Sequence, residues 1–375
     1  MNHRTTPDLN DPALARGFSS ADAFRVVPEG LVAGQSAEAI VSSGEGYWLA
    51  GGPIVFTRAR LLWRTPDGSA GEASFGLDAL NNWVARAGGR QNLDIAIERL
   101  STPRPELVPV AHKRPKIVGV LNVTPDSFSD GGKFERADLA VRHGAAMIEE
   151  GADIIDVGGE STRPGADPVS PDDQCRRILP VIDGLAGRVP ISVDTRNATV
   201  MRNALDAGAA IINDVSALSD DPNTLNVVAA AGCPVILMHS LRAPKTMQMA
   251  PHYKDVRLDI LDYLETRITA CVSSGIARNK VIVDPGIGFG QDDVHIALLM
   301  RDLAVLHGLG CPVMLGASRK SFIGRVDRPG PAAERLGGSV AAAVLGLGCG
   351  TQFLRVHDVA QTRQAVAVWA HTHGL

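Results

Sequence analysis

Residues 120–132 read Val-Leu-Asn-Val-Thr-Pro-Asp-Ser-Phe-Ser-Asp-Gly-Gly, an apolar run that passes directly into a polar loop. β-branched residues dominate Ile117–Leu121 and no polar side chain interrupts them, which predicts a buried strand. Pro125 restricts the residue before it to extended geometry, and Gly131-Gly132 allow backbone angles that other residues resist. Polar groups gathered at the carboxyl end of a strand are typical of active sites in (β/α)8 barrels.

The same alternation continues downstream of this stretch. Apolar runs are separated by helical segments such as Ala137–Glu150 and Pro171–Leu185, and Ser170 is a predicted N-cap of the second. Eight Val/Ile-rich runs with helices between most of them predict a parallel sheet buried on both faces, and eight units over roughly 260 residues match a TIM barrel. A doubly wound open sheet is the alternative, but no GxGxxG fingerprint follows the first strand. The predicted strands are Ile117–Asn122, Ile154–Val157, Ile191–Asp194, Ile211–Asp214, Val235–Met238, Val281–Asp284, Val313–Gly316 and Gln352–Val356.

Almost every predicted strand ends in an ionisable or amide side chain. A single such residue is commonly a turn former or a helix cap, but the carboxyl ends of barrel strands meet at one mouth. The set therefore predicts an active site there. The strand-end segments, in chain order, are Asn122, Gly158–Gly165, Asp194–Arg196, Asn213-Asp214, Met238-His239, Asp284–Gly290, Ser318–Ser321 and Arg355–His357.

These groups form two chemical sets. The first suits the edge and faces of a flat, donor-rich heterocycle, with Lys320 as a charged donor. The second seeks anions, since guanidinium groups and free N–H groups at a helix start bind phosphates. Arg355 and His357 could instead be a surface salt-bridge pair, but their i, i+2 spacing on one strand face favours a shared anion. The first set also holds Asp194, Asn213, Asp284, Phe289 and Met238; the second also holds Arg163 and the helix start after Asp358.

Composition and charge limit the class of protein. The 375 residues are 45% hydrophobic and 21% charged, and the formal net charge is −4, so nucleic acid is not expected as a partner. Five dispersed cysteines indicate reduced thiols rather than a disulfide framework. The first twenty residues lack an apolar signal core, and no apolar run is long enough to span a bilayer. A cytoplasmic protein without membrane partners is expected.

The chain is predicted to divide near residue 112. The proline-rich, charged segments 101–109 and 111–115 have the composition of a linker. Residues 1–112 are expected to form a small α+β accessory domain of unknown role, and residues 113–375 the barrel. Three of the four tryptophans precede the linker, where Ile54–Trp63 predicts a strand and Leu77–Ala87 a helix. No catalytic constellation is visible in this region.

The motifs together resemble the dihydropteroate synthase family, over about residues 115 to 370. The family is a TIM barrel that joins 6-hydroxymethyl-7,8-dihydropterin pyrophosphate to p-aminobenzoate in folate biosynthesis, giving 7,8-dihydropteroate and pyrophosphate, and it is the sulfonamide target. Phe128 is followed directly by Ser129, without the altered loop of sulfonamide-insensitive relatives. The motifs are Asn122–Gly132, Gly158–Gly165, Val193–Thr195, Asn213-Asp214, Asp284–Phe289, Ser318–Lys320 and Arg355–His357.

The resemblance implies a role for each matching residue. Asp194, Asn213, Asp284 and Lys320, with Met238 and Phe289, are expected to bind the pterin. Asn122, Arg355 and His357 are expected to hold the pyrophosphate, with Mg²⁺ as cofactor near Asn122 and Asp130. Phe128, Thr162, Arg163, Pro164 and Ser321 are expected to frame the p-aminobenzoate. Asp130, Lys320 and Asp194 are the expected catalytic residues.

Two other functions are weighed against this one. A methyltetrahydrofolate-dependent methyltransferase shares the barrel and the Asp/Asn pterin contacts, but it has no pyrophosphate for Arg355 and His357 to hold. A catalytically silent relative that acts as a scaffold has no physical reason to keep candidate residues at every motif. The family resemblance also implies a homodimer.

Overall fold

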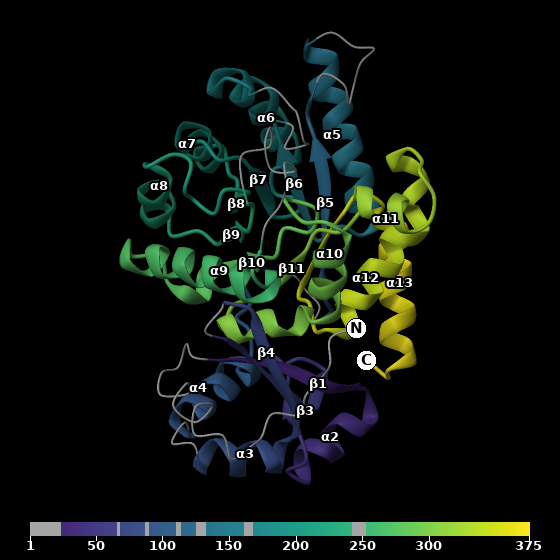
Figure 1. The fold of residues 1–375 in the computed structure, drawn as a ribbon. Coiled ribbons are helices and arrows are strands. Elements are labelled where there is room, and N and C mark those ends of the chain that lie inside the picture. Colours follow the sequence, from purple (N-terminus) through teal and green to yellow (C-terminus); the bar gives the residue numbers. More distant parts are fainter. Residues whose placement is uncertain are drawn as a thin grey trace.

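The centre of the molecule is a closed sheet of eight parallel strands, which occupies the upper half of Figure 1. The computed structural model describes residues 24–65, 68–86, 90–109, 114–124, 133–160, 168–241 and 253–375. The strands follow the order β10, β9, β8, β7, β6, β5, β12, β11, and a parallel bridge between Val283 and Val313 closes the barrel. The strands are β5 (Lys116–Asn122), β6 (Ile154–Gly158), β7 (Ile191–Asp194), β8 (Ile211–Asp214), β9 (Val235–Met238), β10 (Val281–Asp284), β11 (Met314–Leu315) and β12 (Phe353–Val356).

Helices cover the outside of this sheet. Strands β7, β8, β9 and β10 are buried at every residue, because one face of the sheet meets the helices and the other lines the barrel interior. The helices are α5 (Lys133–Glu150), α6 (Pro171–Leu185), α7 (Ala198–Asp206), α8 (Thr224–Ala231), α9 (Val256–Ser273), α10 (Asp293–Arg301), α11 (Ser321–Val326), α12 (Leu336–Gly348) and α13 (Val359–Thr372), with the 3-10 turns η2 (Arg278–Lys280), η3 (Leu303–Leu309) and η4 (Ala332–Arg335).

The floor of the barrel is closed by a segment that precedes it in sequence. Val108 is buried and Leu107 packs beside it, against apolar side chains from the N-terminal halves of seven barrel strands. The segment after α4 therefore packs into the barrel rather than serving only as a tether. The strand residues in this cluster are Val118, Ile154, Ile211, Ile236, Ile282, Met314 and Phe353.

The N-terminal region forms its own α+β unit below the barrel (Figure 1). Its central strand pairs antiparallel with the strands on either side, and Phe56 and Leu61 are fully buried between sheet and helices. The elements are β1 (Arg25–Ala33), α2 (Gln35–Ser42), β2 (Tyr47–Trp48), β3 (Ile54–Arg64), β4 (Ala70–Gly76), α3 (Leu77–Arg86) and α4 (Arg90–Ser101).

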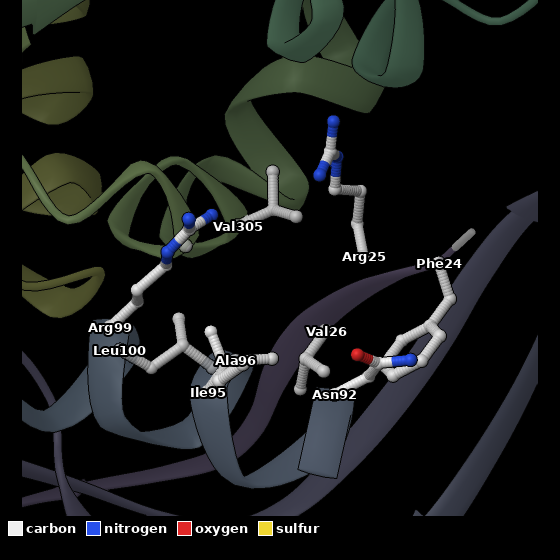
Figure 2. A pocket seen from close by; sticks show the side chains of 10 residues that line it. Phe24, Arg25, Val26, Asn92, Ile95, Ala96, Arg99, Leu100 and Val305 are labelled. Carbon is white, nitrogen blue, oxygen red and sulfur yellow. The ribbon is translucent and has the colours of Figure 1, made fainter. Parts of the chain in front are cut away.

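This unit packs against α9 and η3 of the barrel. Ala304 of η3 belongs to the apolar core of the N-terminal unit, and Trp369 of α13 packs on that core. Figure 2 shows a hollow at this junction, with Val26 and Leu100 on one side and Val305 on the other.

The eight-stranded barrel and the α+β character of the N-terminal unit are confirmed, and the open-sheet alternative is wrong. Strands β7 to β10 have the predicted bounds, whereas β11 is shorter than Val313–Gly316. The predicted division at residues 112 and 113 stays a prediction. In the described part of the chain, no helix is both long enough and apolar enough to cross a membrane.

Candidate active site

The polar strand ends meet at one mouth, as the sequence predicts for a barrel. A hollow there has about 300 Å³ of empty space, part of it open to solvent. It combines charged groups with apolar surfaces, and most of its lining comes from the predicted site residues. The lining residues are Asn213, Val215, Met238, Asp284, Phe289, Met314, Gly316, Lys320 and Arg355.

Two buried carboxylates share one guanidinium beside this hollow. Arg355 Nε donates to Asp156 Oδ2 at 2.7 Å, and Arg355 Nη2 donates to Asp194 Oδ2 at 2.8 Å. These residues come from β12, β6 and β7, so the barrel closure brings together positions up to 199 residues apart. Such a cluster holds Arg355 firmly, because both ion pairs are shielded from water.

The second oxygen of each carboxylate has no hydrogen-bond donor among the described residues. Asp156 Oδ1 and Asp194 Oδ1 are buried and accept no hydrogen bond from any residue that the structure describes. An unsatisfied buried acceptor costs free energy, and such groups are concentrated where a ligand completes them. The pair therefore favours a ligand that presents several N–H donors.

Burial and nearby charges together raise the pKa of Asp194. Its burial raises its pKa to about 7, the nearby carboxylates of Asp156 and Asp214 add to this, and Arg355 opposes it. Burial alone lowers the pKa of Arg355, but Asp156 and Asp194 more than offset this, so the net shift is upward and the guanidinium stays charged.

The adjacent residues Asn213 and Asp214 at the end of β8 have different tasks. Asn213 Nδ2 donates to Asp156 Oδ2 at 3.1 Å and so joins the carboxylate cluster. The carboxylate of Asp214 accepts the backbone N–H and hydroxyl of Ser216 and the N–H of Leu218, so it shapes its own loop.

Asp284 and Lys320 face the same hollow from β10 and the start of α11. Lys320 Nζ lies 3.8 Å from the centroid of the Phe289 ring, a cation–π geometry. Burial lowers the pKa of Lys320 to about 7, with repulsion from Arg355 as the next cause. Burial raises the pKa of Asp284 to about 6, although the N–H of Gly286 and the charge of Lys320 work against this rise.

A close approach of two strand ends fixes the position of Asp284. Gly286 has a φ of 67°, and its backbone lies so near β9 that an added Cβ would be 1.9 Å from the carbonyl oxygen of His239. Gly286 N donates to Asp284 Oδ1 at 2.7 Å, and His239 N donates to the carbonyl of Asp284 at 3.0 Å. Only glycine fits this turn.

The end of β12 also carries His357. Its Nδ1 is 3.1 Å from Ser318 Oγ, and burial lowers its pKa to about 4, helped by Arg355. His357 is therefore neutral at physiological pH in the free protein. A neutral imidazole can donate one hydrogen bond to an anion but does not add a charge.

Comparison with known proteins identifies the family. The family model described as "Pterin binding enzyme" matches residues 118–357. The dihydropteroate synthase of Escherichia coli K12 is 47% identical over 256 residues, which are 68% of this chain and 90% of that protein. A dihydropteroate synthase of Xanthomonas albilineans solved with 4-aminobenzoic acid has a TM-score of 0.66 at 44% identity, covering 70% of this chain and 94% of the other. The chain belongs to the dihydropteroate synthase family.

A second structure of the Xanthomonas albilineans enzyme contains 7,8-dihydropteroate. It is 41% identical to this chain, with a TM-score of 0.63, and covers 70% of this chain and 95% of that one. The match to the family model begins at residue 118, after the N-terminal α+β unit. The N-terminal unit therefore lies outside the part of this chain that matches the family model.

The structure brings together most of the predicted pterin set. Asp194, Asn213, Asp284, Lys320 and Arg355 are linked around one hollow, with Met238 and Phe289 on its walls. Ser321 begins α11, and its hydroxyl accepts from Arg325. Asn122 lies at the end of β5 with its Oδ1 beside Gly158. Phe128, Asp130, Thr162, Arg163 and Pro164 lie outside the described residues.

Sequence reasoning missed Asp156, which lies at the middle of β6 and is fully buried. A signal for it exists, since a carboxylate inside the apolar run Ile-Ile-Asp-Val-Gly must be paired or functional. For a dihydropteroate synthase fold, this residue joins β6 to the same acceptor cluster as β7 and β8.

A magnesium ion remains an expectation. Within the described ranges, no group of three or more His, Cys, Asp or Glu side chains has the arrangement to hold a metal ion. Mg²⁺ is often held by one or two protein oxygens plus waters and substrate phosphates. Asn122 Oδ1 at the mouth fits such a weak, substrate-assisted site.

Proposed function

We propose that this chain is a dihydropteroate synthase, a transferase that moves the pterinylmethyl group from pyrophosphate to the amine of p-aminobenzoate. The family membership supports this activity and the folate pathway to which it belongs. One observation in this structure carries the proposal. The buried Oδ1 atoms of Asp156 and Asp194 accept no hydrogen bond from the described residues, so a ligand with N–H donors can bind them.

A pterin matches this cluster chemically. Its aminopyrimidinone edge carries an exocyclic amine and ring N–H groups, which can donate to Asp156, Asp194 and Asp284. Lys320 can donate to the acceptors at the opposite edge. Met238 and Phe289 offer polarisable and aromatic surfaces for the ring faces. A ring that leaves these buried polar groups unpaired binds with a large loss of free energy. The site therefore discriminates between ligands by their hydrogen-bond pattern.

The pyrophosphate is assigned to the outer part of the mouth. Arg355 uses Nε and Nη2 for the two carboxylates, and Nη1 donates no hydrogen bond among the residues described, so Nη1 would be the nitrogen that donates to the anion. His357 would donate one hydrogen bond. Asn122 and Asp130 would hold Mg²⁺, which when bound neutralises the leaving pyrophosphate.

The p-aminobenzoate is assigned to the loops around this mouth. Phe128, Thr162, Arg163 and Pro164 would frame the ring, and Ser321 would lie near its carboxylate at the start of α11. The related enzyme solved with 4-aminobenzoic acid supports a site for that compound in the family.

The reaction needs no nucleophilic residue from the protein. Cleavage of the bond between the methylene carbon and the pyrophosphate oxygen sends the electron pair to the leaving group. The buried carboxylates, with Asp130, stabilise the positive charge that develops on the pterin methylene. The neutral arylamine then forms the new C–N bond, and its proton passes to solvent or to the departing pyrophosphate.

The methyltransferase alternative is not supported by the relatives, which are dihydropteroate synthases. The hollow lined by the predicted site residues argues against an inactive scaffold protein. A homodimer in the cytoplasm stays part of the proposal.

The direct test incubates the purified protein with the pterin pyrophosphate, p-aminobenzoate and Mg²⁺ and measures dihydropteroate. Asp284→Asn is the matched variant, because Asn keeps an oxygen that accepts from Gly286 but loses a carboxylate acceptor. We expect product from the parent chain, and from the variant a loss of pterin binding with little change in melting temperature. Absence of product from a folded parent chain would reject the proposal.

A further inference from the structure

A buried cluster of charges joins the N-terminal unit to the barrel. Arg60 of β3 donates to Glu29 and Glu72 within its own unit, and its Nη2 donates to Asp302 Oδ1 at the end of α10, at 2.6 Å. The Arg60 side chain is 7% exposed and that of Asp302 only 2%. A cation buried this deeply between two units fixes their relative position, since a shift would leave unpaired charges out of water.

The same cluster holds the first turn of α9. Arg257 Nη1 donates to Glu72 Oε2 at 3.0 Å and to Asp302 Oδ2 at 2.8 Å, while Arg257 Nη2 donates to Asp255 Oδ2 at 2.7 Å. Asp255 is the N-cap of α9 and also accepts the backbone N–H of Leu258. The carboxylate of Glu72 thus connects β4 of the N-terminal unit directly to the start of a barrel helix.

A second contact from the N-terminal unit reaches the same place. Gly68, between β3 and β4, lies against Lys254, because a Cβ added at Gly68 would be 2.6 Å from the Lys254 side chain. Lys254 N donates to Asp259 Oδ2 at 2.9 Å, which ties this residue to α9. Two separate contacts therefore hold residues 254–257.

The segment held in this way packs on the wall of the active site. The ring of Tyr253 lies 6.0 Å from that of His239, centroid to centroid, and the ring of Tyr263 in α9 lies 5.0 Å from His239. His239 follows Met238 of the pterin hollow, and its backbone N–H donates to the carbonyl of Asp284. Among the described residues, Tyr253 therefore connects the clamped segment, through its ring contact with His239, to the pterin-binding strand ends.

We propose that the N-terminal unit is a positioning element for the pterin site, and that Arg60 and Glu72 hold the 253–257 segment in place against His239. This rests on the proposed function. None of the described residues of this unit lines the hollow, so the unit acts through Arg257 and Tyr253. Arg60 and Glu72 are positioning residues, and their loss is expected to loosen the β9 and β10 side of the hollow more than the p-aminobenzoate side.

The test compares two charge-balanced double variants of the full chain. Arg60→Met with Glu72→Gln removes the two N-terminal side chains that reach the barrel, keeps the half-buried Glu29, and leaves Arg257 paired with Asp302 and Asp255. Arg25→Met with Asp262→Asn also breaks ion pairs between the units on a later turn of α9, that of Arg25 with Asp262 at 3.0 Å and that of Arg64 with Asp262 at 2.6 Å, while Arg64 keeps its pair with Asp259. The single variant Glu72→Gln serves as a milder version if the first double variant does not fold.

Three quantities are measured: the affinity for unphosphorylated 6-hydroxymethylpterin, the KM for each substrate, and hydrogen exchange of amides 253–257. We expect the Arg60/Glu72 variant to weaken pterin binding about five- to tenfold and to speed exchange at 253–257. The KM for p-aminobenzoate and all values of the Arg25/Asp262 variant should stay within about twofold of the parent.

Unchanged pterin affinity with unchanged exchange at 253–257 would overturn the inference. Equal weakening by both double variants would also overturn it, because that result assigns the effect to general docking of the units. A parent chain that binds no pterin would instead reject the proposed function, and hydrogen exchange would still report whether the clamp exists.

Discussion

The ammonium of Lys320 lies 3.8 Å from the centroid of the Phe289 ring, at the wall of the pterin hollow. Burial lowers the pKa of Lys320 to about 7, and repulsion by Arg355 adds to this. The charged form of Lys320 is therefore lost as the pH rises through neutrality, which is unusual for a lysine.

Pterin affinity is expected to have an optimum in pH. Above a pH of about 7 Lys320 loses its proton, whereas Asp194 gains one below about 7 and Asp284 below about 6, so binding should weaken on both sides of neutrality. Calorimetric titration with 6-hydroxymethylpterin across this range checks the profile. Lys320→Met should bind weakly and lose the alkaline limb. If binding by this variant still weakens above a pH of about 7, the titrating group belongs to the ligand and not to Lys320.

Asp194→Asn should abolish pterin binding and yet stabilise the free protein at alkaline pH. Burial raises the pKa of Asp194 to about 7 from 3.8, so the unfolded chain ionises this carboxyl more readily than the folded one. Its ionisation opposes folding, beginning above a pH of about 4 and fully above about 7. Removing it helps only in that range, while Arg355 keeps Asp156 as a partner. Urea unfolding at two pH values is the measurement; an equal gain near pH 4 would contradict the assignment.

Gly286→Ala should be strongly destabilising and should reduce pterin binding. An added Cβ would lie 1.9 Å from the His239 carbonyl oxygen, at a φ of 67°. The matched control is Gly187→Ala, where φ is 75° but no atom lies within 4 Å of the added Cβ. We expect the control to cost about 1 kcal/mol and Gly286→Ala more than about 3 kcal/mol. Similar costs by urea unfolding would show that the turn can relax.

A chain that begins at Ala111 should be less soluble than one that begins at Thr102. The shorter chain lacks Leu107 and Val108, and so uncovers the apolar floor of the barrel around Met314 and Phe353. Size-exclusion chromatography and thermal unfolding of the two chains distinguish them. Equal behaviour would show that the floor does not need this cover.

The barrel could be predicted because its signals are local. The runs Ile191–Asp194 and Ile211–Asp214 are β-branched, and each ends in a polar residue where the strand leaves the sheet, so even their bounds follow from the sequence. Most predicted pterin residues meet for the same reason: parallel strands bring their carboxyl ends to one mouth.

The remaining features depend on contacts without a local signature. The pairing of Arg60 with Asp302 spans 242 positions, and nothing in the sequence around Arg60 distinguishes it from a surface arginine on a strand. The sequence likewise identifies Arg355 as an anion-binding residue but not as the shared partner of Asp156 and Asp194. Arg355 can bind both carboxylates only because of the register of β12, β6 and β7 in the barrel.

The docking of the N-terminal unit on α9, η3 and the end of α13 limits how two copies of this chain can associate. A twofold axis places the same patch of each subunit against itself. The faces of α9 and η3 toward the N-terminal unit are already covered in every copy, so they cannot form a self-complementary contact. The axis of the proposed homodimer therefore cannot run through these two faces, and any twofold contact has to use a surface that the N-terminal unit leaves open or presents itself.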